Sequence, residues 1–208
     1  NESFSLLIVT LPGHHIDEHI DRIASISAVR RVMFMGGYVS GMDRWADITG
    51  RDKTVFAYPG VSAVLEREEG RVLYCDVEET GSEGSAGDNE SRHLRGITAG
   101  PIEGELPEGS GDLCRVFTDA KIPVTRSDSM QSVFLSQAAV RLPMSAALLF
   151  AGGNLGVLSE RGDLLKLMVK GIREGLAAVR TLGFELNPRS LSMYRYVPIF
   201  IIANMIRG

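Results

Sequence analysis

The hydrophobic positions near the start of the chain follow a strand–helix–strand pattern. Residues 4–10 form an almost continuous apolar run, which is typical of a strand buried on both faces of a parallel sheet. Apolar residues then recur at helical spacing over 16–26, and a second apolar run follows at 32–35. We therefore predict a right-handed parallel crossover. The next elements expected are a helix at 42–48 and strands at 54–58 and 71–77.

The pattern changes along the second half of the chain. Residues 78–91 are rich in Gly, Ser and Glu and predict a surface loop. From residue 129 the apolar spacing is almost entirely helical, so we place a boundary near 128 between an α/β part, 1–128, and an all-α part, 129–208. After the loop, the α/β part is expected to contain strands at 95–98 and 122–125 and a helix at 112–120. The all-α part is expected to contain helices at 130–150, 164–182 and 191–206.

Composition and charge narrow the classes of partner. The net charge of −4 over 208 residues supplies no broad basic surface, so we expect no nucleic acid or membrane partner and favour a small molecule or a protein. The apolar run at 197–203 is far shorter than the ~20 residues of a membrane span, which suggests a cytoplasmic protein. Cys75 and Cys114 are predicted to be reduced core thiols. Because the chain opens on Asn1 rather than Met, one interpretation is a fragment of a longer protein.

The carboxyl ends of the first two predicted strands are the first place to look for a ligand, because open parallel sheets bind ligands there. These ends carry Leu11, Pro12, His15 and Gly36, although an ordinary tight turn is the alternative explanation. His14, His15 and His19 are clustered in sequence, and His15 and His19 share a helix face and could ligate a metal. Because no H-E-x-x-H pattern occurs and no Cys or further His lies close by, we expect surface histidines and no metal. Neither G-x-G-x-x-G nor G-x-x-x-x-G-K-[ST] occurs.

Two further residues are candidates for contact with a substrate. Tyr58 precedes a Pro-Gly pair after the third predicted strand, a pattern that by itself indicates a turn. Asn154 lies between two predicted helices, and its side chain offers both a hydrogen-bond donor and an acceptor. Taken alone, Asn154 would be an ordinary loop residue.

The order of these parts resembles the ketopantoate reductase family, whose members are NADPH-dependent 2-dehydropantoate 2-reductases. The similarity covers most of the chain and is spread over several short segments. The matching segments, with the family pattern of each, are 7–16 (V-T-L-K-x-x-Q), 32–39 (Q-N-G), 56–60 (G-F-P-G), 138–148 (N-P-L-T-A), 154–158 (N-G-E-L) and 164–183 (R-E-G...A-L-G).

The resemblance implies a partial Rossmann-type parallel sheet over 1–128 and a helical domain of the 6-phosphogluconate dehydrogenase-like type over 129–208. It also implies NADPH as the cofactor, a 2-oxo acid of the 2-dehydropantoate class as the substrate, and a place in pantothenate biosynthesis. The residues that it assigns to the cofactor are Leu11, Pro12, His15 and Gly36, and those it assigns to the substrate are Tyr58 and Asn154.

The chain departs from the family at two important places. The family's N-terminal G-x-G-x-x-G unit is absent from this sequence. The family's general-acid Lys corresponds to Phe134 or Leu135, and no Lys occurs between Lys121 and Lys166. Of the family's polar site residues, the turn Asn is retained as Asn154.

The missing Lys leaves three functions open. Reduction of a 2-oxo acid needs a proton donor at the developing alkoxide, a role that contributes about 10²–10⁴-fold to the rate. Either another residue donates the proton, with His15 and Tyr58 as the candidates, or the activity has been lost. The chain is then a ketopantoate reductase, a divergent dehydrogenase of another 2-oxo acid, or an inactive relative with a nucleotide-binding or regulatory role. A homodimer is compatible with the sequence.

Overall fold

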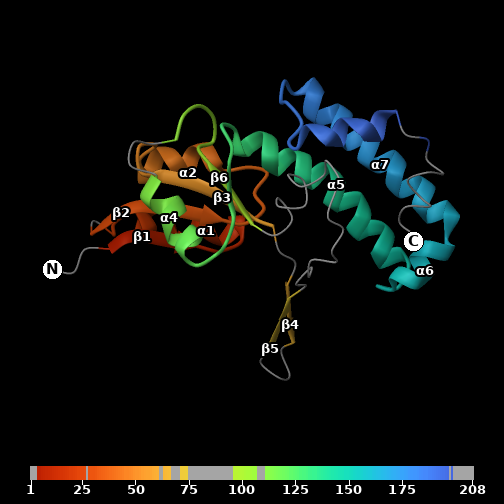
Figure 1. Cartoon of the computed structure of the whole chain (residues 1–208), viewed down its shortest axis with the longest axis horizontal. Coiled ribbons are helices and arrows are strands. Elements are labelled where there is room, and N and C mark those ends of the chain that lie inside the picture. Colours follow the sequence, from red (N-terminus) through yellow and green to blue (C-terminus); the bar gives the residue numbers. More distant parts are fainter. Residues whose placement is uncertain are drawn as a thin grey trace. The chain divides into compact units, whose positions relative to one another are not determined.

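The computed structural model describes residues 4–26, 28–60, 63–66, 71–74, 96–106, 111–196 and 198. The chain folds as two compact units (Figure 1), the first made of Asn1–Gly36 and Ser40–Met130 and the second of Gly37–Val39 and Gln131–Gly208. The predicted loop at 78–91, Cys75, and residues 197 and 199–206 of the last predicted helix lie outside the described residues, as does the side chain of Cys114.

The first unit is built on a mixed sheet of five strands. Its elements, in chain order, are β1 (Phe4–Val9), α1 (Gly13–Ala24), β2 (Val29–Met35), α2 (Met42–Thr49), β3 (Thr54–Pro59), β4 (Ala63–Glu66), β5 (Arg71–Tyr74), β6 (Ile97–Gly100), α4 (Gly111–Asp119) and β7 (Val124–Arg126). The strand order is β1-β2-β3-β6-β7. The neighbours β1 and β2, β2 and β3, and β6 and β7 are parallel, whereas β3 and β6 are antiparallel. The predicted α/β class is confirmed.

The strand predicted at 71–77 is confirmed over its described part as β5, Arg71–Tyr74, which pairs antiparallel with β4 in a separate two-stranded sheet. One expectation about an individual strand was wrong. The first strand was expected to be buried on both faces, yet β1 lies at the edge of the described sheet, with Phe4 59% and Ile8 41% exposed. An apolar run records the preference of its side chains and does not record how many strands flank it.

Helices cover both faces of this sheet. Because side chains alternate along a strand, Met33 and Phe34 point to opposite faces. Met33 packs in a cluster with Phe117 of α4, and on the other face Phe34 lies 5.6 Å, ring centroid to ring centroid, from Trp45 of α2. The Nε1 of Trp45 also donates a 2.7 Å hydrogen bond to Oδ1 of Asp17 on α1, which links α1 and α2.

The second unit is helical, as predicted. Its helices are α5 (Met130–Phe150), α6 (Leu155–Glu160), α7 (Gly162–Thr181) and the 3-10 helix η1 (Arg189–Arg195). The predicted bounds of α5 are confirmed to the residue, and α7 ends beside Gly183, whose φ of +90° suits glycine. The amides of Gly183 and Phe184 donate to the carbonyls of Arg180 and Val179, at 2.9 and 3.2 Å, which closes the helix end.

The segment after α7 differs from the sequence prediction. A helical pattern was expected over 191–206, and the described part of it is the short 3-10 helix η1. Pro188 precedes η1 directly and lies in an extended conformation, so it separates η1 from α7.

Small residues allow α5 and α7 to approach closely. A Cβ atom built on Gly175 of α7 would lie 3.0 Å from the Cβ and 3.1 Å from the carbonyl oxygen of Ala139 on α5. One turn away, a Cβ on Gly171 would lie 3.1 Å from the Cβ of Pro143. Pro143 cannot donate a hydrogen bond to the carbonyl of Ala139, so that oxygen faces the glycine instead of a helix partner. Glycine inside a helix costs about 1 kcal/mol relative to Ala, and the close packing offsets that cost.

We expect Gly175→Val to lower the free energy of unfolding of the second unit by about 1–3 kcal/mol, because the added atoms overfill the contact with α5. Urea unfolding followed by circular dichroism measures this difference. The matched control is Ala178→Val on the exposed face of the same helix, which should cost only about 0.7 kcal/mol or less through helix propensity. Equal losses for the two variants would contradict a close helix contact at Gly175.

Helix α5 also has the length and composition of a membrane span. Its most apolar 18-residue window has a mean hydropathy of 1.5, and 22% of that window is buried. Leu142, Leu149 and Phe150 are exposed on it. Core helices of soluble proteins share this composition, so the helix by itself assigns no location.

Candidate functional site

The parallel pairing of β1, β2 and β3 brings their carboxyl ends to one edge of the sheet. Val9 pairs with Phe34, and Phe34 pairs with Phe56, so β1 and β2 end within one residue of each other and β3 continues three residues beyond Phe56, to Pro59. This edge receives the residues that the sequence predicted as cofactor contacts, which are Leu11, Pro12, His15 and Gly36. The edge is therefore assembled from three successive strand ends, and cofactor binding there stays a prediction.

The turn after β1 is held by backbone hydrogen bonds. Pro12 is the N-cap residue of α1, and its carbonyl accepts from the amides of His15 at 3.0 Å and Ile16 at 3.1 Å. Leu11 and Pro12 are exposed, so this turn presents an apolar surface next to the start of the helix. Gly36, after β2, donates its amide to the carbonyl of Ala57 at 3.0 Å, which extends the β2–β3 pairing by one residue.

The histidines of α1 lie on its surface. His15 Nδ1 lies 3.2 Å from Oε2 of Glu18, and this hydrogen bond lowers the pKa of Glu18. His14 and His19 are exposed as well. Among the described residues, no three His, Cys, Asp or Glu side chains come together in an arrangement that could hold a metal ion.

Tyr58 lies inside β3, in agreement with the strand predicted at 54–58, and pairs with Thr98 of β6. The turn expected from Pro59 onward begins one residue later, because Pro59 also belongs to β3 and pairs with Ile97. The Tyr58 side chain is buried. A Pro-Gly pair indicates a turn locally, whereas here the neighbouring strand β6 extends the pairing up to Pro59.

Phe134 and Leu135, the two residues that the resemblance matches to the family's general-acid Lys, are both apolar. Phe134 of α5 is 2% exposed, and Leu135 packs against the core of the second unit. No proton donor is supplied by either side chain. The next polar residue along the helix, Ser136, is also buried, and its Oγ accepts a 3.0 Å hydrogen bond from the amide of Asn187.

Sequence reasoning missed Tyr38, which packs against this position. The Tyr38 ring meets Phe134 edge-on, with 5.6 Å between ring centroids, and both belong to the second unit. Burial raises the pKa of Tyr38 to about 12, so its phenol is neutral at physiological pH and keeps its proton. A tyrosine two residues after Gly36, in a glycine-rich strand end, was the signal available in the sequence.

Asn154 has a structural role. Its Oδ1 accepts a 3.1 Å hydrogen bond from the amide of Val157, so the side chain caps the N-terminus of α6. This bond accounts for an Asn at this position without any ligand. Contact between Asn154 and a substrate stays a prediction.

The fold is that of ketopantoate reductases, with a Rossmann-type sheet followed by a helical domain. Similar solved structures include D-mandelate dehydrogenase in complex with NADH, with a TM-score of 0.65, 13% identity, and coverage of 91% of this chain and 58% of that one. The 2-dehydropantoate 2-reductase from Porphyromonas gingivalis W83 has a TM-score of 0.61 and 11% identity, with 99% of this chain and 62% of that one covered. The 2-dehydropantoate 2-reductase from Methylococcus capsulatus has a TM-score of 0.61 and 13% identity, with 100% of this chain and 59% of that one covered.

These comparisons confirm the predicted resemblance at the level of the fold. The chain spans about three fifths of the length of each of these proteins. No protein-family model matches the sequence, and no curated protein matches it.

Proposed function

We propose that the chain is part of a nicotinamide-dependent reductase that acts on 2-oxo acids of the 2-dehydropantoate class. The fold it shares with both D-mandelate dehydrogenase and 2-dehydropantoate 2-reductases carries this proposal. D-mandelate dehydrogenase has also been solved with NADH and anilino(oxo)acetate, a molecule with a carbonyl beside a carboxylate. A small-molecule substrate and a cytoplasmic location are part of the same proposal.

The strand-end edge of the first unit fits the nicotinamide part of such a cofactor. Leu11 and Pro12 offer an exposed apolar surface for a flat ring, and Gly36 has no side chain that would block it. The sequence holds no G-x-G-x-x-G turn for the pyrophosphate, so the fit concerns this one part of the cofactor. When bound, NADPH would supply a hydride.

The residues of this chain would then position the substrate and protonate its carbonyl oxygen. Phe134 can do neither, because it has no polar group and is buried. Tyr38 is the side chain beside it that carries an exchangeable proton, and its raised pKa keeps that proton on the phenol. His15 and Tyr58 are the alternative donors that the sequence suggested.

A second candidate function is binding without catalysis. The observation that favours it is that Phe134, one of the two residues matched by resemblance to the family's Lys, is apolar and buried. In this case the protein retains the fold and a nucleotide-binding edge and serves in regulation.

Assays of the full natural gene product separate the two candidates. Loss of NADPH absorbance in the presence of ketopantoate, pyruvate or phenylglyoxylate is expected if the protein is a reductase. Binding of NADPH without turnover of any of these acids would support the second candidate. A protein that binds neither NADPH nor NADH would contradict both.

We expect the 208-residue chain by itself to bind NADPH with a Kd weaker than about 1 mM. The reason is that the helix N-terminus and glycine turn that hold a pyrophosphate in dinucleotide folds are absent from its sequence. Isothermal titration calorimetry measures the affinity, and reduced nicotinamide mononucleotide, which lacks the pyrophosphate bridge, serves as the control ligand and should bind about equally. Micromolar affinity for NADPH would show that the cofactor contacts are elsewhere in this chain.

A further inference from the structure

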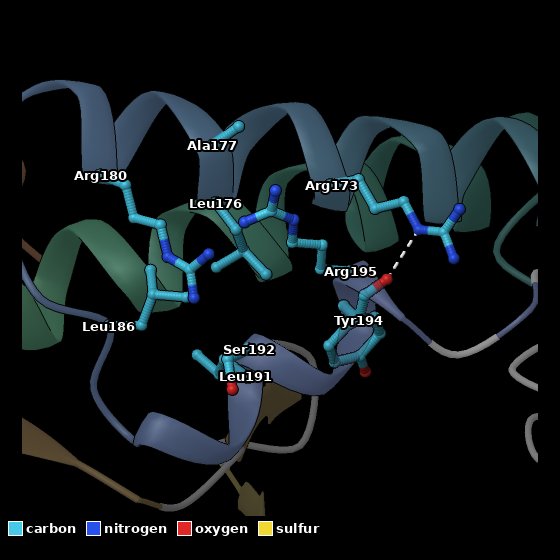
Figure 2. Close-up of a pocket in the computed structure, with 9 residues that line it drawn as sticks. All are labelled: Arg173, Leu176, Ala177, Arg180, Leu186, Leu191, Ser192, Tyr194 and Arg195. Carbon is cyan, nitrogen blue, oxygen red and sulfur yellow. Dashed lines mark hydrogen bonds between the residues drawn. The ribbon is translucent and has the colours of Figure 1, made fainter.

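A pocket of about 350 Å³ lies between α7 and η1, entirely within the second unit (Figure 2). Its floor is apolar, and its rim carries three arginines. The floor is formed by Leu176, Ala177, Leu186 and Leu191. The rim includes Arg173, Arg180, Arg195, Ser192 and Tyr194.

One of the arginines fixes the wall of the pocket. The Nε of Arg173 donates a 2.7 Å hydrogen bond to the backbone carbonyl of Tyr194, the contact drawn as a dashed line in Figure 2. This bond holds η1 against α7. Asn187 is bonded in turn to the buried Oγ of Ser136 on α5, so the loop that enters η1 is also held in place.

The other two arginines are directed toward the pocket. Figure 2 shows the guanidinium groups of Arg180 and Arg195 in the space between α7 and η1. Within the described residues, neither group forms an ion pair with a carboxylate. The nearest carboxylate along the chain, Glu185, pairs with Arg189 at 2.9 Å. The pocket therefore has a net positive rim.

The chemistry of this lining defines the ligand that it would take. A guanidinium group binds a carboxylate through two parallel hydrogen bonds, and the apolar floor favours a hydrocarbon body. Burial raises the pKa of Tyr194, so its phenol adds no negative charge to the rim at physiological pH. The volume is large enough for a small organic molecule.

We propose that this pocket binds a small organic carboxylate with an apolar body, with Arg180 and Arg195 holding the carboxylate and Leu176 and Leu191 contacting the body. This site goes beyond the proposed reductase function. It lies on α7 and η1, and Phe134 of α5 is not among the residues that line it.

The probe for the test is 3-phenylpropanoate, titrated into the 208-residue chain without any nicotinamide nucleotide. We expect a Kd of about 1 mM, as is usual for a ligand of this size. The neutral analogue 3-phenylpropanamide should bind at least about tenfold more weakly, because it cannot pair with the guanidinium groups. Chemical-shift changes in the amide spectrum of the protein report both affinities.

The double variant Arg180→Gln, Arg195→Gln should weaken 3-phenylpropanoate binding at least about tenfold and leave the weak binding of the amide unchanged. The control is Arg161→Gln, since Arg161 lies at the other end of α7 and pairs with Asp163. Circular dichroism checks that each variant is folded. Equal affinity for the acid and the amide, or a double variant that binds like the control, would overturn the proposal. Because no nucleotide is used, the result is independent of the reductase assays.

Discussion

Replacing Trp45 with Ala should lower the free energy of unfolding of the first unit by about 3–5 kcal/mol, the usual cost of removing a buried Trp. Trp45 is 1% exposed, and its ring lies against the ring of Phe34. The ring centroids of Phe34 and Phe56 are in turn 5.5 Å apart. The side chain therefore fills the space between α2 and the sheet. Removing it leaves a cavity that the surrounding side chains cannot close.

The hydrogen bond of Trp45 contributes much less than its packing. Its acceptor, Asp17, is partly exposed and also pairs with Arg44 at 3.2 Å, so water and Arg44 can satisfy the carboxylate when the indole is absent. Trp45→Phe keeps an aromatic ring and loses the N–H, so it separates the two effects. We expect Trp45→Phe to cost clearly less than Trp45→Ala.

Urea unfolding followed by far-ultraviolet circular dichroism measures both variants. Intrinsic fluorescence is unsuitable, because the chain has a single Trp, which these variants remove. A loss below about 1 kcal/mol for Trp45→Ala would contradict a core position for this residue.

The second large effect concerns catalysis. We expect the full natural gene product to reduce ketopantoate at least about a hundredfold more slowly than a 2-dehydropantoate 2-reductase that carries the family's Lys. The reason is that the resemblance matches the family's Lys to Phe134 or Leu135, and neither side chain can donate a proton. The neutral phenol of Tyr38 beside Phe134 is a weak acid, because burial raises its pKa to about 12. Steady-state kcat values for the two enzymes, measured with saturating NADPH, give the ratio.

Leu135→Lys, or Phe134→Lys if the match along the helix is shifted by one residue, should raise this rate if the remainder of the site is intact. A buried amine also costs stability through desolvation, so circular dichroism must show that both variants fold. A wild-type rate equal to that of Lys-bearing enzymes would refute the importance of this position. In that case Tyr38→Phe, His15→Gln and Tyr58→Phe would identify the residue that donates the proton.

Part of the candidate site was predictable from the sequence. The apolar character of Phe134 and Leu135 is a property of the residues themselves, and their position within a long helix follows from its spacing. The contact of Tyr38 with Phe134 was not predictable, because it joins residues almost a hundred positions apart in the chain. The pocket beside Arg180 was also not predictable from the sequence, because it forms only when η1 packs against α7.

The sequence by itself determined the segments of regular structure. The helix α5 over Met130–Phe150, the strand β3 and the end of α7 beside Gly183 follow from spacing and from glycine's tolerance of a positive φ. These features depend on residues close together in the chain, so a local pattern is enough to specify them.

The tertiary structure decided how the segments pair. The antiparallel pairing of β3 with β6, which extends β3 to Pro59, and the edge position of β1 both depend on which distant segment lies alongside. Pairing energies come from contacts between segments distant in the chain, and hydrophobic spacing within one segment does not record them.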